Sequence, residues 1–180
     1  MRRIVRGGAA VIAGVGIVVL GAGAASAKPS KQSAQKYAKT VCSTYDGLIN
    51  DLTSYAGTVG GLDPTDPTAF QQGATAQTQA LITKIKAAEK KLGNVYPDID
   101  NGQKVGKLLA TNAKELDQAL TSDLQDLSTG GVAGATQFAA GIATLSTKIS
   151  DPFSKVTDQD LIHAFGKEKA CKNVVQVEPG

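Results

Sequence analysis

The sequence has no tryptophan, one histidine, one methionine and two cysteines among its 180 residues. One histidine and two cysteines are too few ligands for an ordinary zinc site, and they leave little for acid–base or nucleophilic catalysis. We therefore expect no metal and no cofactor. The scarcity argues against most enzyme chemistries and favours a role in binding.

Arginine is confined to the first six residues, as Arg2, Arg3 and Arg6. Beyond residue 27 the chain has 16 lysines and 16 acidic residues, so its formal net charge is zero. A neutral chain without guanidinium groups lacks the bidentate donors that recognise phosphate and guanine. We therefore expect no nucleic-acid partner.

The first 27 residues have the pattern of a secretory signal peptide. The three arginines precede an uncharged run over residues 7–25, and the run closes on Ala25-Ser26-Ala27. A positive start, an apolar middle and a small-x-small end predict cleavage after Ala27. The alternative is an uncleaved membrane anchor, but Gly14 and Gly16 interrupt the apolar run, and a spanning helix needs about 20 strongly apolar residues. We expect a secreted or envelope protein with no integral membrane segment after cleavage.

Apolar residues recur at spacings of three and four along most of the remaining chain, and proline or glycine stands where the pattern breaks. This periodicity is typical of amphipathic helices. It predicts helices from about Ser30 to Thr58, from Pro67 to Gly93, from the capping pair Asp100 and Gln103 to Gly130-Gly131, over residues 132–149, and after the cap Thr157-Asp158-Gln159-Asp160. No stretch has the alternation that predicts a strand.

Short connections between long helices require neighbours to run antiparallel. We therefore expect an all-α fold: an up-down-up-down four-helix bundle with a short C-terminal helix, closed by one disulfide. This domain would span residues 28–172, and residues 173–180 would form a flexible tail. The predicted apolar stripes are Tyr37, Val41, Leu48, Leu52, Tyr55 and Val59 in the first helix, Phe70, Ala74, Leu81, Ile85, Ala88 and Leu92 in the second, and Val105, Leu109, Ala113, Leu116, Leu120, Leu124 and Leu127 in the third.

Cys42 and Cys171 are the only cysteines. In an exported protein an even pair predicts a disulfide, with two free thiols as the alternative. At 1.5 Å per residue Cys42 would lie about 16 Å along the first helix and Cys171 about 20 Å along the last, at similar heights. We interpret the bond as a structural clasp; a redox switch is the alternative, and no C-x-x-C motif favours it.

Lysines gather near both ends of the domain, and the predicted disulfide would bring the two groups together. The candidate basic interaction patch consists of Lys31, Lys36, Lys39, Lys167, Lys169 and Lys172. Such a patch could contact an anionic wall polymer or lipid headgroups. The alternative is an ordinary solvated surface, which the zero net charge favours.

Two weaker motifs could indicate a catalytic site or a calcium site. His163 follows Asp160 by three residues, so a carboxylate–imidazole pair could form on one helix face, but no G-x-S-x-G motif supplies a nucleophile. Asp98-x-Asp100-Asn101-Gly102 resembles a calcium loop, yet its glycine comes one position early and Leu109 stands where a glutamate is required. A helix cap is the simpler interpretation of that motif.

Three segments together resemble the small secreted proteins and lipoproteins, of unknown function, that are common in actinobacteria. They are Tyr37-Ala38-Lys39-Thr40-Val41-Cys42, Pro97-Asp98-x-Asp100-Asn101-Gly102 and Ala170-Cys171-Lys172. The resemblance implies a helical bundle with two paired cysteines, and it supplies no catalytic or binding residues. This chain departs from the lipoproteins because no cysteine follows the predicted cleavage site.

The leading hypothesis is a non-enzymatic exported bundle of the cell envelope or medium that contacts an unidentified macromolecule. A second hypothesis is a carrier of a small apolar ligand, because aromatic residues opposite many alanines and glycines could leave a cavity in the bundle core. A third hypothesis is a hydrolase centred on His163.

Overall fold

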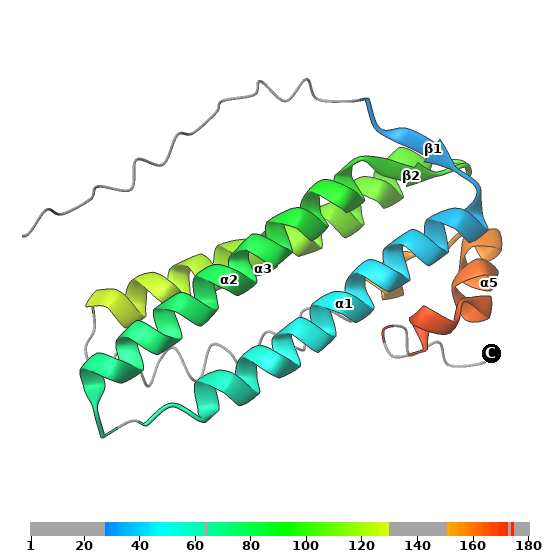
Figure 1. The fold of residues 1–180 in the computed structure, drawn as a ribbon. Helices are drawn as coiled ribbons and strands as arrows, with labels where there is room; N and C mark the ends of the chain where they lie inside the picture. The colour runs from blue at the N-terminus through cyan, green and yellow to red at the C-terminus, as the bar shows by residue number, and fades with distance from the viewer. Residues whose placement is uncertain (1–27, 64, 130–150, 173, 175–180) are drawn as a thin grey trace, which may run out of the picture.

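The computed structural model describes residues 28–63, 65–129, 151–172 and 174. The predicted signal peptide, the predicted fourth helix over residues 132–149 and most of the predicted tail lie outside the described residues. Within them, three long helices lie side by side: α1 (Ala34–Gly60), α2 (Pro67–Gly93) and α3 (Gly102–Thr129). The chain reverses direction between α1 and α2 and again between α2 and α3 (Figure 1).

The predicted bounds of the second helix are confirmed. The Asp66 carboxylate accepts a hydrogen bond from the backbone N–H of Ala69 at 3.0 Å, and Pro67 is the first helical residue. Proline suits that position because its missing N–H would have no partner inside the helix. The helix ends at Gly93, as predicted.

The predicted start of the first helix is wrong by four residues, because Ser30–Gln32 form strand β1. This strand pairs in parallel with β2 (Val95–Pro97), with Lys31 opposite Tyr96. Three residues are too few to give a recognisable alternation, so the sequence predicted no strand. The Ser33 side chain accepts from the backbone N–H of Lys36 and caps α1, which then continues to Gly60.

The predicted capping pair of the third helix is displaced by one residue. Asn101 has a positive φ of 60° and precedes the helix, and its carbonyl accepts from the backbone N–H of Lys104 at 2.8 Å. Gly102 then begins α3 directly against β2, where an added Cβ would overlap the carbonyl oxygen of Pro97. The close approach of this turn to the strand therefore requires glycine.

The core lies along the facing sides of the three long helices, as the apolar stripes predicted. Every residue of the α1 stripe is buried, and so are most residues of the other two stripes; Phe70, Val105 and Leu124 are partly buried. Buried hydroxyls in the core are mostly paired: the Tyr45 hydroxyl donates to the Leu109 carbonyl at 2.8 Å, and the Tyr55 hydroxyl lies 2.8 Å from Thr78 Oγ1.

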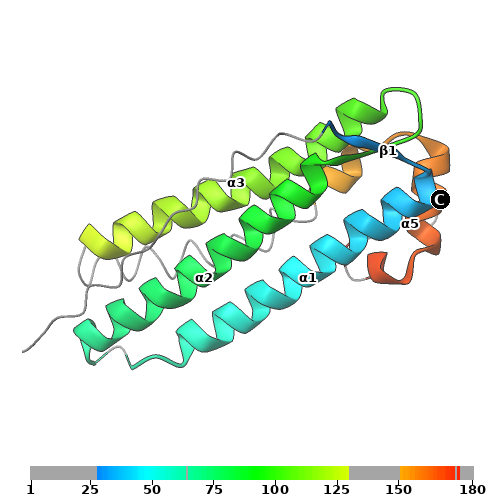
Figure 2. The same ribbon diagram turned by 45° about the horizontal axis from the view of Figure 1, so that its top comes forward.

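The C-terminal segment packs at the end of the molecule where α1 begins (Figure 2). It consists of η1 (Asp151–Lys155), α5 (Gln159–Lys167) and η2 (Lys169–Cys171). The predicted short helix is confirmed, with Asp158 as its cap. The expectation that Cys171 lies on that helix is wrong, because α5 ends at Lys167 and a separate turn carries the cysteine. The Phe153 ring packs edge-on between Tyr45 and Phe165, at 5.1 and 5.5 Å.

None of the helices among the described residues is both long and apolar enough to cross a membrane.

Candidate functional site

The predicted disulfide is confirmed. It joins Cys42 of α1 to Cys171 of η2, with 4.8 Å between the two Cα atoms, and both cysteines are buried. The bond attaches the C-terminal segment to the first third of α1. It therefore brings the chain around Lys172 to the side of the helix that carries Lys39.

The six lysines of the candidate patch are all exposed. Lys36 and Lys39 lie on the first two turns of α1, and Lys167, Lys169 and Lys172 lie at and beyond the end of α5. Lys31 of β1 forms an ion pair with Asp98 at 2.6 Å. The hydrogen bond to Asp98 and the attraction between the two charges raise the pKa of Lys31.

The charges of the long helices are segregated along the molecule. Dividing each helix near its midpoint gives a lysine-rich end, residues 28–47 and 81–115, and an acidic end, residues 48–80 and 116–129. The lysine-rich end has 11 lysines and five acidic residues, and the acidic end has six aspartates and no lysine. These two ends occupy opposite extremities of the helices (Figure 1).

Within the described residues, two of the three ion pairs bridge the boundary between these ends. Lys84 contacts Asp51 at 2.5 Å, and Lys86 lies 3.9 Å from Asp117. Nearer the extremity, Lys36, Lys39, Lys90, Lys91, Lys104 and Lys107 are exposed and have no ion pair in the described part of the chain. The lysine-rich end therefore presents cationic groups that internal pairing does not neutralise.

The zero net charge of the chain does not neutralise the positive charge of the lysine-rich end. A helix of 27 residues, such as α1, is about 40 Å long. The Debye length at physiological ionic strength is about 8 Å, so an approaching partner senses one end and not the other. The formal net charge of the chain therefore does not describe the potential at one end, because it sums charges that are too far apart to interact.

The sequence did contain a signal for this segregation. No lysine occurs between Lys39 and Lys84, or between Lys114 and Lys148. Only the folded-back path of the chain shows that both lysine-free stretches reach the same end. For the same reason the sequence pattern alone did not place the lysines of α2 and α3 in the candidate basic interaction patch.

The acidic end includes a short Asx turn. The Asp63 carboxylate accepts from the backbone N–H and the hydroxyl of Thr65, at 2.8 and 2.7 Å. These hydrogen bonds lower the pKa of Asp63. The carboxylate therefore remains ionised at neutral pH.

His163 is exposed on α5, and within residues 151–172 no hydrogen bond or ion pair joins it to Asp160. The calcium-loop motif of the sequence forms the turn between β2 and α3, where Asp98 is paired with Lys31. Among the described residues no cluster of three or more histidine, cysteine or acidic side chains could hold a metal ion.

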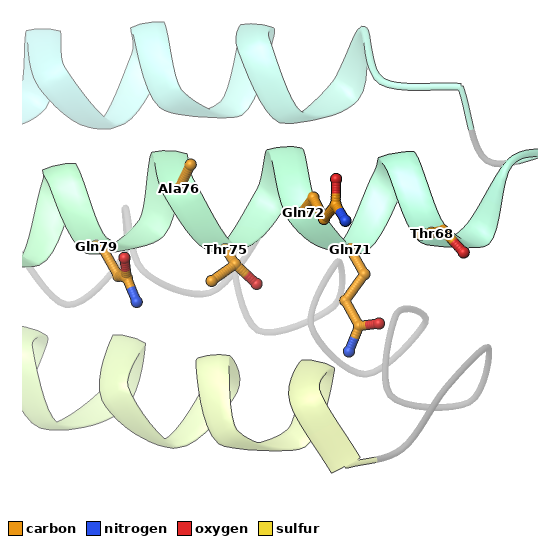
Figure 3. Close-up of a pocket in the computed structure, with 6 residues that line it drawn as sticks. All are labelled: Thr68, Gln71, Gln72, Thr75, Ala76 and Gln79. Atoms are coloured by element: carbon orange, nitrogen blue, oxygen red, sulfur yellow. The ribbon is translucent and has the colours of Figure 1, made fainter. Parts of the chain in front are cut away.

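One pocket of about 360 Å³ lies along α2 (Figure 3). Its lining in the described residues consists of Thr68, Gln71, Gln72, Thr75, Ala76 and Gln79. The Gln71 amide reaches across to α3 and donates to the carbonyls of Leu127 and Ser128, at 3.2 and 3.4 Å. All six of these residues belong to α2, and Ala76 and the side-chain carbon atoms of the glutamines and threonines line the pocket together with their amide and hydroxyl groups.

Comparison of the chain with protein-family models, with curated proteins and with solved structures finds no match in any of the three. The function is therefore inferred from the surface of the chain itself.

Proposed function

We propose that the protein is an exported, non-enzymatic interaction module whose lysine-rich end binds a polyanionic component of the cell envelope. The proposal includes the secretory signal peptide over residues 1–27 and an up-down-up-down bundle in which residues 132–149 form the fourth helix. The observation that carries it is the segregation of 11 lysines to one end, while residues 48–80 and 116–129 of the other end have none.

The positions of the lysines support a role other than helix stability. The N-terminus of a helix carries a partial positive charge, so acidic side chains are favoured in its first turn. The first turns of α1 and α3 contain no acidic residue and instead contain Lys36 and Lys104. Each of these placements costs about 0.3–1 kcal/mol in the helix, which suggests that an external partner uses the charge.

Lysine is suited to this kind of binding. Its ammonium group is a hydrated point charge, which attracts phosphate or carboxylate without fixing a bidentate geometry. A lysine near an anionic surface contributes about 1 kcal/mol. Six lysines lie within five residues of the helix ends at this extremity, so together they support about 6 kcal/mol of attraction, which corresponds to dissociation constants of tens of micromolar.

The test uses fluorescence anisotropy with labelled long-chain inorganic polyphosphate and the exported, disulfide-bonded protein. Wild type should bind at 50 mM NaCl and lose most of that affinity at 300 mM NaCl, because counterion release drives the association. The variant K36Q/K39Q should bind more weakly. The matched control K84Q/K86Q removes the same charge from the middle of the molecule and should bind nearly as wild type.

Two results would overturn the proposal. One is an affinity for polyphosphate that does not change with salt. The other is an equal loss of binding in K84Q/K86Q and K36Q/K39Q, because binding would then depend on total charge and not on the lysines nearest the extremity.

A further inference from the structure

Six lysines of the three long helices lie at nearly the same depth from the helix ends. Lys36 and Lys39 are two and five residues from the start of α1, Lys104 and Lys107 are two and five residues from the start of α3, and Lys90 and Lys91 are three and two residues from the end of α2. Five residues of helix correspond to about 8 Å, which is also about one Debye length. All six can therefore act together on a surface placed across this end.

These lysines also come from three different helices. The first turns of α1, the last turn of α2 and the first turn of α3 surround the β1–β2 pair, and the C-terminal segment packs beside them (Figures 1 and 2). A linear polyanion running across the end would pass along only some of these helix ends at a time. A plane of negative charge would contact all of them at once.

From this arrangement, and resting on the proposed function, we infer that the lysine-rich end docks end-on to an anionic phospholipid surface. The described residues support the upright orientation as well, because a molecule lying flat would bring the acidic end, about 40 Å away along the helices, within a Debye length of the same negative surface. Acidic residues at this end include Asp98 of the β2–α3 turn, which is paired with Lys31, and the C-terminal segment over residues 151–172 has four acidic residues and four lysines, so its formal charge is zero. Binding is electrostatic and reversible.

The experiment measures co-sedimentation of the disulfide-bonded protein with vesicles of phosphatidylcholine alone or with 30% phosphatidylglycerol, a fraction chosen to give about the charge of an anionic membrane. Binding is expected only to the anionic vesicles. The variants K36Q/K39Q and K104Q/K107Q alter different helices, and each should weaken binding by about 25-fold, since one lysine near such a surface is worth about fivefold. The control K84Q/K86Q should remain close to wild type.

A planar partner would contact the ends of α1 and α3 together. The variants K36Q/K39Q and K104Q/K107Q should therefore lose similar affinity. The inference is overturned if neutral vesicles bind equally, if only one of the two end variants loses affinity, or if K84Q/K86Q loses as much as they do. Binding to polyphosphate without binding to anionic vesicles would overturn the planar partner and leave the proposed function standing. Failure to bind either one would overturn both.

Discussion

Removing the disulfide should cost the protein most of its stability. The bond closes a loop of 129 residues, and in the chain-entropy model such a closure contributes about 5 kcal/mol by restricting the unfolded chain. The stability of an entire domain is only about 5–15 kcal/mol. We therefore expect the double variant C42A/C171A to lose about 3–5 kcal/mol and to be marginally folded at 37 °C.

The double variant C42A/C171A loses packing as well as the covalent bond. Both cysteines are buried, so each alanine also removes packed atoms and leaves a small cavity. Reduced wild-type protein retains both sulfur atoms and therefore separates the loss of the covalent bond from the loss of packing. The reduced protein and the double variant should agree within about 1 kcal/mol.

Urea unfolding followed by far-ultraviolet circular dichroism gives the free energy of unfolding by linear extrapolation. The reducing agent should have no effect on C42A/C171A, which serves as the control. A loss below about 1 kcal/mol in both the variant and reduced wild type would refute the reasoning, because the long loop would then add almost nothing to the unfolded-state entropy.

Two further predictions concern buried tyrosines. Tyr37 and Tyr45 lie on α1 and are both fully buried, but among the described residues the Tyr37 hydroxyl has no hydrogen-bond partner, whereas the Tyr45 hydroxyl bonds to Leu109 and Asn112. Urea unfolding should therefore show that Tyr37→Phe costs nothing or stabilises, while Tyr45→Phe costs about 1–2 kcal/mol; equal losses would contradict this. Burial also raises the pKa of Tyr55 from 10.0 to about 12. Between pH 10 and 12 the Tyr55 hydroxyl therefore ionises readily only in the unfolded chain. The contribution of Tyr55 to stability is complete below pH 10 and is lost as the pH rises from 10 to 12. A midpoint of urea unfolding that is unchanged between pH 9 and 12 would contradict this second prediction.

The sequence predicted the long helices because their signals repeat over many turns. Six stripe positions in α1 and seven in α3 point to one face, and local caps such as Asp66 mark single residues. The features that escaped prediction are short or non-local. Strand β1 has three residues and gains its partner from a segment 65 positions later, so nothing nearby in the chain indicates it.

The disulfide was predicted correctly, although the predicted path of the chain to Cys171 was wrong. Cys171 was placed on a continuous last helix, and the chain instead leaves α5 at Lys167 and turns through η2. The Glu168 carboxylate, which accepts from the backbone N–H of Ala170, begins this separate turn. The pairing itself depended only on redox compartment and cysteine number, which do not require the local path of the chain.

The disulfide and the lysine-rich end are linked through the stability of the helices. Lys36 and Lys104 each oppose the dipole of their helix, at about 0.3–1 kcal/mol. Glycines inside the helices, such as Gly47 and Gly57, add about 0.5–1 kcal/mol each, and an added Cβ at either would meet nothing within 4 Å, so packing does not demand them. A disulfide worth about 5 kcal/mol offsets all of these terms together. The covalent bond therefore lets the helices keep lysines where a helix stabilised by its own sequence would have acidic residues.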